Sequence, residues 1–105
     1  MRKSSLTIEA TRSGSTTFLA ASGSLDIATA GEFETAVQHA LAEGTDVVVD
    51  LSALSLCDST GLGAMVRLHR RAEAADASLT LRRPQRGVAE VLAMTGIDKV
   101  IPTEH

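Results

Sequence analysis

The residues best suited to chemistry lie in one small-polar run that extends from Ser52 to Gly61. Within this run, Asp58, Ser59 and Thr60 are consecutive. Asp58 can cap a helix that begins at Ser59, because a side-chain oxygen at the N-cap accepts amides that have no partner within the helix. The positive end of the helix dipole favours a negative group there, so the fold would tolerate a phosphate on Ser59. The three residues could equally form an N-cap and nothing more.

Ser59 lacks the partners of a hydrolase nucleophile. Such a serine needs a histidine and a carboxylate within hydrogen-bonding reach. His69 follows on the same predicted helix about two and a half turns away, which is too far, and we interpret it as a structural residue. We expect His39 and His105 to face solvent. The G-x-S-x-G motif of many hydrolases is also absent, so we predict no catalytic residue.

Gly61 and Gly63 could suggest a dinucleotide-binding loop. However, the third glycine position of that motif holds Val66, and no acidic residue follows on a second strand at the expected distance. The sequence has no G-K-[ST] phosphate loop and no cluster of Cys and His for a metal. We therefore predict a protein that is not an enzyme and that needs no cofactor or metal.

Composition narrows the class of protein further. The 105 residues favour a single domain over residues 1–105. Lys and Arg number 10 against 13 Asp and Glu, a net charge of -3 at pH 7 and the wrong sign for neutralising nucleic-acid phosphates. Phe18 and Phe33 are the only aromatic residues besides histidine, so no platform exists for stacking bases. We predict no direct contact with nucleic acid.

The single cysteine and the hydropathy indicate the compartment. Cys57 alone excludes an internal disulfide, which fits a reducing environment. We favour a small buried hydrophobic role for Cys57 over a redox sensor. No segment reaches the ~18 apolar residues of a membrane span, and no signal-type apolar run follows the basic start. We predict a cytoplasmic protein that does not contact the membrane.

Hydrophobic periodicity predicts the elements that precede Ser59. Alternation over residues 6–10 and 16–21 predicts a hairpin. Thr29 and Glu32 have the spacing of a capping box, which predicts a helix that Gly44 ends. The unbroken valines at 47–49 are typical of a strand buried on both faces of a parallel sheet.

A second helix over residues 59–75 and a strand over 79–82 follow Ser59. Pro84 can open a third helix that Gly96 ends, and residues 99–101 can form a last short strand. The order β-β-α-β-α-β-α-β contains crossovers that are almost always right-handed and lay their strands parallel. We therefore expect an α/β fold with a mixed, mainly parallel sheet of four to five strands, an N-terminal hairpin and three or more helices.

Several motifs resemble one family along most of the chain. Residues 47–51, V-V-V-D-L, followed by C-D-S-T-G-L-G at 57–63, resemble the signature of the bacterial anti-sigma factor antagonists, whose fold is the STAS domain. G-S-L-D-I-A-T-A at 23–30 is similar to that family's G-x-L-D-x-x-T-A turn, and residues 94–100 are similar to its closing helix and strand. Cys57 departs from the pattern, which has a larger apolar residue there. The resemblance covers residues 6–101 and implies a STAS fold.

The resemblance also implies a partner switch. In that family, the unphosphorylated antagonist binds an anti-sigma factor that is itself a serine kinase, and so releases a sigma factor for transcription. The kinase phosphorylates the serine that follows the aspartate, and a metal-dependent serine phosphatase reverses the modification. That serine corresponds to Ser59 here, with Thr60 a less favoured acceptor. The resemblance assigns partner binding to Asp26, Asp58, Thr60, Gly61 and Leu62.

Charge supplies a mechanism for such a switch. A phosphate adds about -1.5 to -2 charges at neutral pH, and we expect Asp26, Asp50 and Asp58 to lie near Ser59. A like-charge mismatch on a docking face can cost several kcal/mol, enough to lower affinity roughly a hundredfold. Two other functions stay open: a STAS scaffold or adaptor in which Ser59 is unmodified, and a STAS domain that handles a small ligand or lipid. For the basic cluster of Arg82, Arg83 and Arg86, we favour a solvated face over a contact with a partner or anionic lipid.

Overall fold

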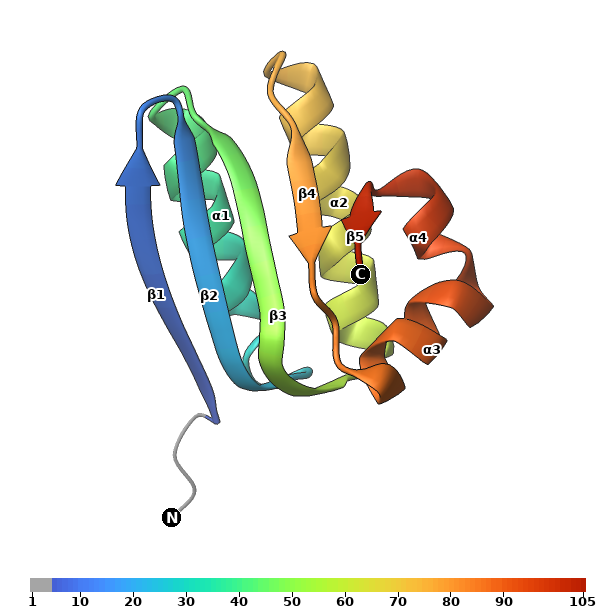
Figure 1. The fold of residues 1–105 in the computed structure, drawn as a ribbon. Coiled ribbons are helices and arrows are strands. Elements are labelled where there is room, and N and C mark those ends of the chain that lie inside the picture. The colour runs from blue at the N-terminus through green and yellow to red at the C-terminus, as the bar shows by residue number, and fades with distance from the viewer. Residues whose placement is uncertain (1–4) are drawn as a thin grey trace.

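The structure is a computed structural model that describes residues 5–105, and it contains one layer of strands backed by helices (Figure 1). This confirms the α/β fold class expected from the sequence. The strands are β1 (Leu6–Ser13), β2 (Thr16–Leu25), β3 (Asp46–Cys57), β4 (Leu79–Arg82) and β5 (Thr103–Glu104). The helices are α1 (Ala30–Ala42), α2 (Ser59–Ala74), α3 (Arg86–Thr95) and α4 (Ile97–Val100).

The five strands form one sheet in the order β1-β2-β3-β4-β5. β1 and β2 make the expected antiparallel hairpin, and every other neighbouring pair is parallel. Helices connect the two strands of each parallel pair. The connections all move the same way along the sheet from β2 to β5, and right-handed crossovers of this kind place the helices on one face. Figure 1 accordingly shows α1 and α2 behind the sheet, while the front face stays uncovered. The carboxyl ends of β2 and β3 therefore lie together at the lower edge of the sheet, where α2 begins.

β3 is the central strand, as the valine run predicts. Val47, Val49 and Leu51 have no exposed surface and face the helices. β3 is much longer than the valine run, because its second half continues to pair with the end of β2 up to Leu25 and Cys57. That pairing includes register shifts along β2, so the strict alternation of buried and exposed residues is lost and local periodicity did not reveal the extension.

The capping box predicted at the start of α1 is wrong. Thr29 is the N-cap residue, but its side chain caps no helix amide. Its buried hydroxyl instead donates to the Ser24 carbonyl oxygen (2.9 Å) and accepts the Asp26 amide (2.9 Å). Thr29 therefore secures the turn that carries Asp26 to the end of β2.

The C-terminal elements also differ from the prediction. Gly96 ends α3 with a positive φ of 76°, as expected, but Pro84 precedes α3 without opening it, since the N-cap is Gln85. Residues 97–100 form the short helix α4 in place of a strand at 99–101, and the last strand, β5, comes after it. No helix within residues 5–105 is long and apolar enough to cross a membrane.

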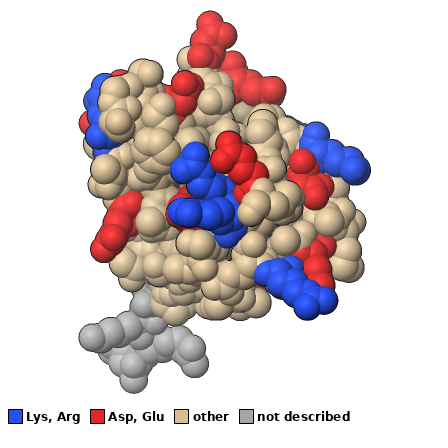
Figure 2. All heavy atoms as spheres, in the orientation of Figure 1, with Lys and Arg blue, Asp and Glu red and all other residues tan. Residues whose placement is uncertain are grey.

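The uncovered face of the sheet carries charges of both signs side by side (Figure 2). Arg82 also lies over the Phe18 ring, with its guanidinium carbon 5.6 Å from the ring centroid. The arginines of the predicted basic cluster form ion pairs within the chain, which are Arg82–Glu104, Arg83–Asp50 and Arg86–Glu90. This pairing agrees with the interpretation of the cluster as a solvated face.

Candidate functional site

Asp58 caps α2 in the way its sequence position predicts. Its backbone is extended, and its Oδ1 accepts the amides of Thr60 (2.9 Å) and Gly61 (3.1 Å). The Asp58 carbonyl accepts the Leu62 amide (2.9 Å), which is the first hydrogen bond within the helix. The carboxylate thus already takes two of the amides that a phosphate at the helix start would otherwise meet.

The turn that carries Asp26 lies beside this cap. Asp58 donates its amide to the Leu25 carbonyl (3.1 Å), and Leu25 pairs with Cys57 at the ends of β2 and β3. The carboxylate of Asp26 accepts the Ala28 amide (3.0 Å) and lies 3.2 Å from the Thr29 hydroxyl oxygen, which fixes the turn. Residues far apart in sequence, Asp26 and Asp58, are therefore held on adjoining turns at the carboxyl end of the sheet.

Ser59 is the exposed member of the cap. Its side chain faces solvent in the first turn of α2, whereas Asp58 and Thr60 are half-buried. Within residues 5–105, the Ser59 hydroxyl makes no hydrogen bond, and no histidine or carboxylate is bonded to it as in a catalytic triad. The hydroxyl is therefore accessible to a modifying enzyme and is not activated as a nucleophile.

Gly61 and Leu62 are buried, so neither presents a side chain to solvent. A Cβ added at Gly61 would lie 2.7 Å from Leu25 Cγ and 3.0 Å from Cys57 Sγ. Glycine here permits α2 to approach the end of β2 closely, which is a packing role. That these two residues also contribute to partner binding stays a prediction, and any contribution would come through the shape of the surface above them.

Two exposed apolar side chains flank the cap and were missed by the sequence reasoning. Ile27, next to Asp26, is 81% exposed, and Leu56, just before Cys57, is 51% exposed. Single exposed apolar residues are common, but these two lie on the adjoining turn and on the strand end that frame Ser59. We refer to Asp26, Ile27, Leu56, Asp58, Ser59 and Thr60 as the switch face. Leu56 fell within the small-polar run, where its exposure had no local signal.

Cys57 closes the base of this region. Burial, and secondarily the charge of Asp58, raises the pKa of its thiol to about 12. The thiol therefore stays protonated at neutral pH, whereas a redox sensor needs an accessible thiolate. The interpretation of Cys57 as a small buried hydrophobic residue agrees with its burial.

Asp50 does not belong to the switch face, contrary to the expectation from sequence. It lies about 20 Å before the Cys57 end of β3, at ~3.3 Å per residue. Burial by itself raises the pKa of Asp50, but hydrogen bonds from Ser52, together with the hydrogen bond and charge of Arg83, lower it below its ordinary value. Its charge is paired with Arg83 and adds nothing to the surface around Ser59.

His69 is distant from Ser59, as predicted. Its side chain is 13% exposed, and its Nε2 lies 3.5 Å from a Glu73 carboxylate oxygen on the same helix. His39 is 75% exposed and pairs with Glu43. The described part of the chain holds no group of three or more His, Cys, Asp or Glu residues suited to a metal ion.

The family-model comparison agrees with the fold. A model described as "Mlab, STAS domain" matches residues 8–102, which is most of the chain. The chain therefore belongs to the STAS domain family. Among curated proteins, none matches the sequence significantly.

Solved structures show the same fold. A candidate anti-sigma factor antagonist from Thermotoga maritima has a TM-score of 0.85 at 22% identity, over 93% of this chain and 86% of that one. An anti-sigma factor antagonist from Mycobacterium paratuberculosis has a TM-score of 0.81 at 24% identity, over 95% and 86%. The Bacillus protein SpoIIAA in its phosphorylated form has a TM-score of 0.70 at 19% identity, over 93% and 89%. At these identities the likeness establishes the fold.

Proposed function

We propose that this protein is an anti-sigma factor antagonist whose binding is switched off by phosphorylation of Ser59. The observation that carries the proposal is the exposed Ser59 hydroxyl, placed directly after the N-cap Asp58 on the carboxyl edge of a STAS sheet. Of the three similar structures, two are named as an antagonist or a candidate antagonist and the third, SpoIIAA, is phosphorylated, and these names support the proposal. The protein acts by binding and not by catalysis.

The switch works by changing charge on a surface that is otherwise suited to docking. Ile27 and Leu56 supply exposed apolar area beside Ser59. A phosphate on Ser59 cannot use the Thr60 and Gly61 amides that Asp58 holds, so its charge is left for the partner to accommodate. With Asp26 and Asp58 on the same face, the added charge of about -1.5 to -2 opposes docking.

The proposed partners are those that the resemblance to the anti-sigma factor antagonists implies. An anti-sigma factor that is also a serine kinase binds the unmodified switch face in the cytoplasm of a bacterium, and this frees a sigma factor for transcription. A metal-dependent serine phosphatase restores the hydroxyl. Asp26 and Asp58 shape the surface that the kinase reads, Thr60 borders it, and Gly61 and Leu62 support it from below.

The test is calorimetry of Ser59 variants against the anti-sigma factor kinase encoded in the same genome. Ser59→Ala should bind as tightly as the wild type, whereas Ser59→Asp should bind roughly a hundredfold more weakly, equivalent to about 2.7 kcal/mol. Mass spectrometry after incubation with the kinase and ATP should find one added phosphate, located on Ser59.

Thr60 provides the matched control. Thr60→Ala should still gain the phosphate, and Ser59→Ala should not, although both variants keep the Asp58 cap. Equal affinities of Ser59→Ala and Ser59→Asp for the kinase would rule out the switch, as would phosphorylation at Thr60 in place of Ser59.

A second candidate is a STAS adaptor that does not switch. It rests on membership of the STAS domain family, which the match to a model described as "Mlab, STAS domain" shows. Under this alternative Ser59 is unmodified and the switch face holds a permanent partner in a larger assembly. Co-purification of a partner whose affinity is the same for Ser59→Ala and Ser59→Asp would support this alternative.

A further inference from the structure

Along residues 8–12, β1 leaves one edge of the sheet open to further pairing. In the described residues β1 and β5 are the two edge strands. β5 is only two residues long, which is one way in which proteins protect an edge. β1 has eight residues, contains no Pro or Lys, and pairs with β2 without a register shift. Apart from the charges of Glu9 and Arg12, the β1 edge therefore lacks the usual features that block the addition of another strand.

The register identifies which backbone groups face outward from this edge. The Ser24 amide donates to the Ser5 carbonyl (3.0 Å), and hydrogen-bonded positions alternate along an antiparallel pair. Every second residue of β1, counted from Ser5, therefore forms its backbone hydrogen bonds with β2. The intervening residues Ile8, Ala10 and Arg12 direct their amide and carbonyl groups away from the sheet.

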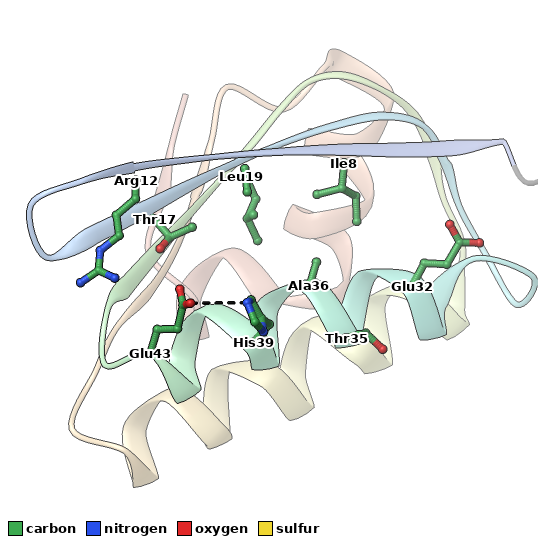
Figure 3. A pocket seen from close by; sticks show the side chains of 10 residues that line it. Ile8, Arg12, Thr17, Leu19, Glu32, Thr35, Ala36, His39 and Glu43 are labelled. Carbon is green, nitrogen blue, oxygen red and sulfur yellow. Dashed lines mark ion pairs between the residues drawn. The ribbon is translucent and has the colours of Figure 1, made fainter.

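The same three residues line a cleft between β1 and α1 (Figure 3). Its volume is about 570 Å³, which lies within the range of ligand-binding pockets. Ile8, Ala10 and Leu19 form the sheet side of the cleft, and Ala36 faces them from α1. The two alanines leave the space apolar and unfilled.

Charged side chains lie at opposite ends of this cleft (Figure 3). Arg12 lies at one end, near the pair of His39 and Glu43, which are 3.5 Å apart. Glu32 lies at the other end, on the first turn of α1. Among the described residues neither Arg12 nor Glu32 forms an ion pair, and the Arg12 Nε donates only to the Gly14 carbonyl (3.2 Å). An occupant that complements the cleft carries an acidic group at the Arg12 end and a basic group at the Glu32 end.

We propose that the β1 edge and this cleft bind an extended segment of another protein, which adds to the sheet as a strand antiparallel to β1. Backbone groups of the segment pair with those of Ile8, Ala10 and Arg12, and its alternate apolar side chains enter the cleft. Strand addition of this kind draws its affinity from backbone hydrogen bonds and its specificity from pockets for alternate side chains. An acidic residue of the segment faces Arg12 and a basic residue faces Glu32.

A second copy of this chain does not fit the same role. Residues directly opposite each other across an antiparallel pair share one face of the sheet. The acidic residue of β1 is Glu9, which alternates with Ala10 and so points to the face away from the cleft. A second β1 therefore brings no carboxylate to Arg12.

The test uses a designed peptide, acetyl-Glu-Thr-Val-Thr-Val-Thr-Lys-amide, which places Glu, both valines and Lys on one face. At saturating peptide, NMR should show the amides of Ile8, Ala10 and Arg12 exchanging with solvent at least tenfold more slowly. The matched control peptide carries N-methyl groups on the two valines, which removes the donors that face β1. It should bind at least tenfold more weakly.

A pair of variants tests the cleft separately from the edge. Ala36→Leu fills the cleft and should weaken binding of the peptide at least tenfold. Ala42→Leu makes the same change at an exposed site of α1 outside the cleft and should leave affinity unchanged. Three results would overturn the proposal: equal binding of the N-methylated peptide, unchanged exchange of the three amides, or a dimer in sedimentation whose three amides are protected without peptide. None of these results depends on whether Ser59 is phosphorylated.

Discussion

The switch face and the β1–α1 cleft differ in how tightly the backbone below them is packed. Beneath the switch face the backbones are in close contact, with Gly61 of α2 against Leu25 and the Asp58 amide bonded to the Leu25 carbonyl. At the cleft, Ala10 and Ala36 leave about 570 Å³ between strand and helix. The first region displays a few side chains on a rigid base, whereas the second displays backbone groups beside empty space.

Because of this difference in packing, the two regions tolerate different substitutions. On the switch face an exposed side chain such as that of Ser59 has room for added atoms, whereas Gly61 in the layer below it does not. In the cleft, side chains can grow with little effect on stability, but the exposed backbone has to stay regular. The free energy of unfolding of variants in each region measures this contrast.

Gly23 links the two regions, because it pairs with Leu6 of β1 and Leu54 of β3. It has a φ of +102°, and a Cβ there would lie within covalent distance of the Ser5 carbonyl oxygen. Gly23→Ala should lower the free energy of unfolding by about 3 kcal/mol or more, as measured by urea titration. Gly14→Ala is the control, since Gly14 also has a positive φ but open surroundings, and it should lose only about 1 kcal/mol. Equal losses would mean that hairpin and strand end are not in close contact.

Gly61→Ala and Ala36→Leu compare the two regions directly. One added carbon at Gly61 meets Leu25 and Cys57 and should destabilise by about 2 kcal/mol, since overpacking a core forces neighbours to shift. Three added carbons at Ala36 enter the cleft and should change stability by less than about 0.5 kcal/mol. Thermal unfolding of both variants measures the contrast. A larger loss for Ala36→Leu would show that the cleft is not free space.

Substitutions of Asp58 test the N-cap of α2, which lies on the switch face. Asp58→Ala should lower the free energy of unfolding by about 1 kcal/mol, because the amides of Thr60 and Gly61 lose their acceptor. Asp58→Asn retains a side-chain oxygen at the N-cap and should lose only a few tenths of a kcal/mol. If urea titrations show the same loss of unfolding free energy for both variants, the carboxylate charge contributes more to stability than the hydrogen bonds do.

Asp50→Asn should give a smaller loss of stability than Asp58→Ala, and one that depends on pH. Its pKa is lower in the folded chain than its ordinary 3.8, so its contribution is present above pH 3.8 and is lost as the pH falls through the folded pKa. Asp50→Asn should destabilise by less than about 1 kcal/mol at pH 7, since the pair with Arg83 is partly exposed. The difference from the wild type should shrink in urea titrations at pH 3. A difference that grows in acid would contradict the assigned direction.

The sequence predicted the elements whose signals are local. The hairpin, the central valines of β3 and the helix that starts at Ser59 follow from periodicity and capping, which act within a few residues. It failed at Thr29, whose hydroxyl bonds within the preceding turn to Ser24 and Asp26 and so leaves α1 without a side-chain cap. It also missed the extension of β3, which depends on pairing with β2.

The candidate site divides in the same way. Asp58 and Ser59 were identified from consecutive residues, because an N-cap and the residue after it are adjacent in the chain. Ile27 and Leu56 were missed, since each belongs to a different element and their exposure depends on how β2 and β3 end. Asp50 was wrongly included, because its pairing joins a residue of β3 to Arg83, which directly follows β4.

Apolar spacing and N-cap chemistry are local properties, so the sequence alone indicated an α/β chain with a serine directly after a helix N-cap. Only the tertiary structure decided which groups stand beside that serine, which charges are already paired, and that a cleft and an open backbone edge coincide along β1. Those features depend on strand register and helix placement, which arise from packing over the whole chain.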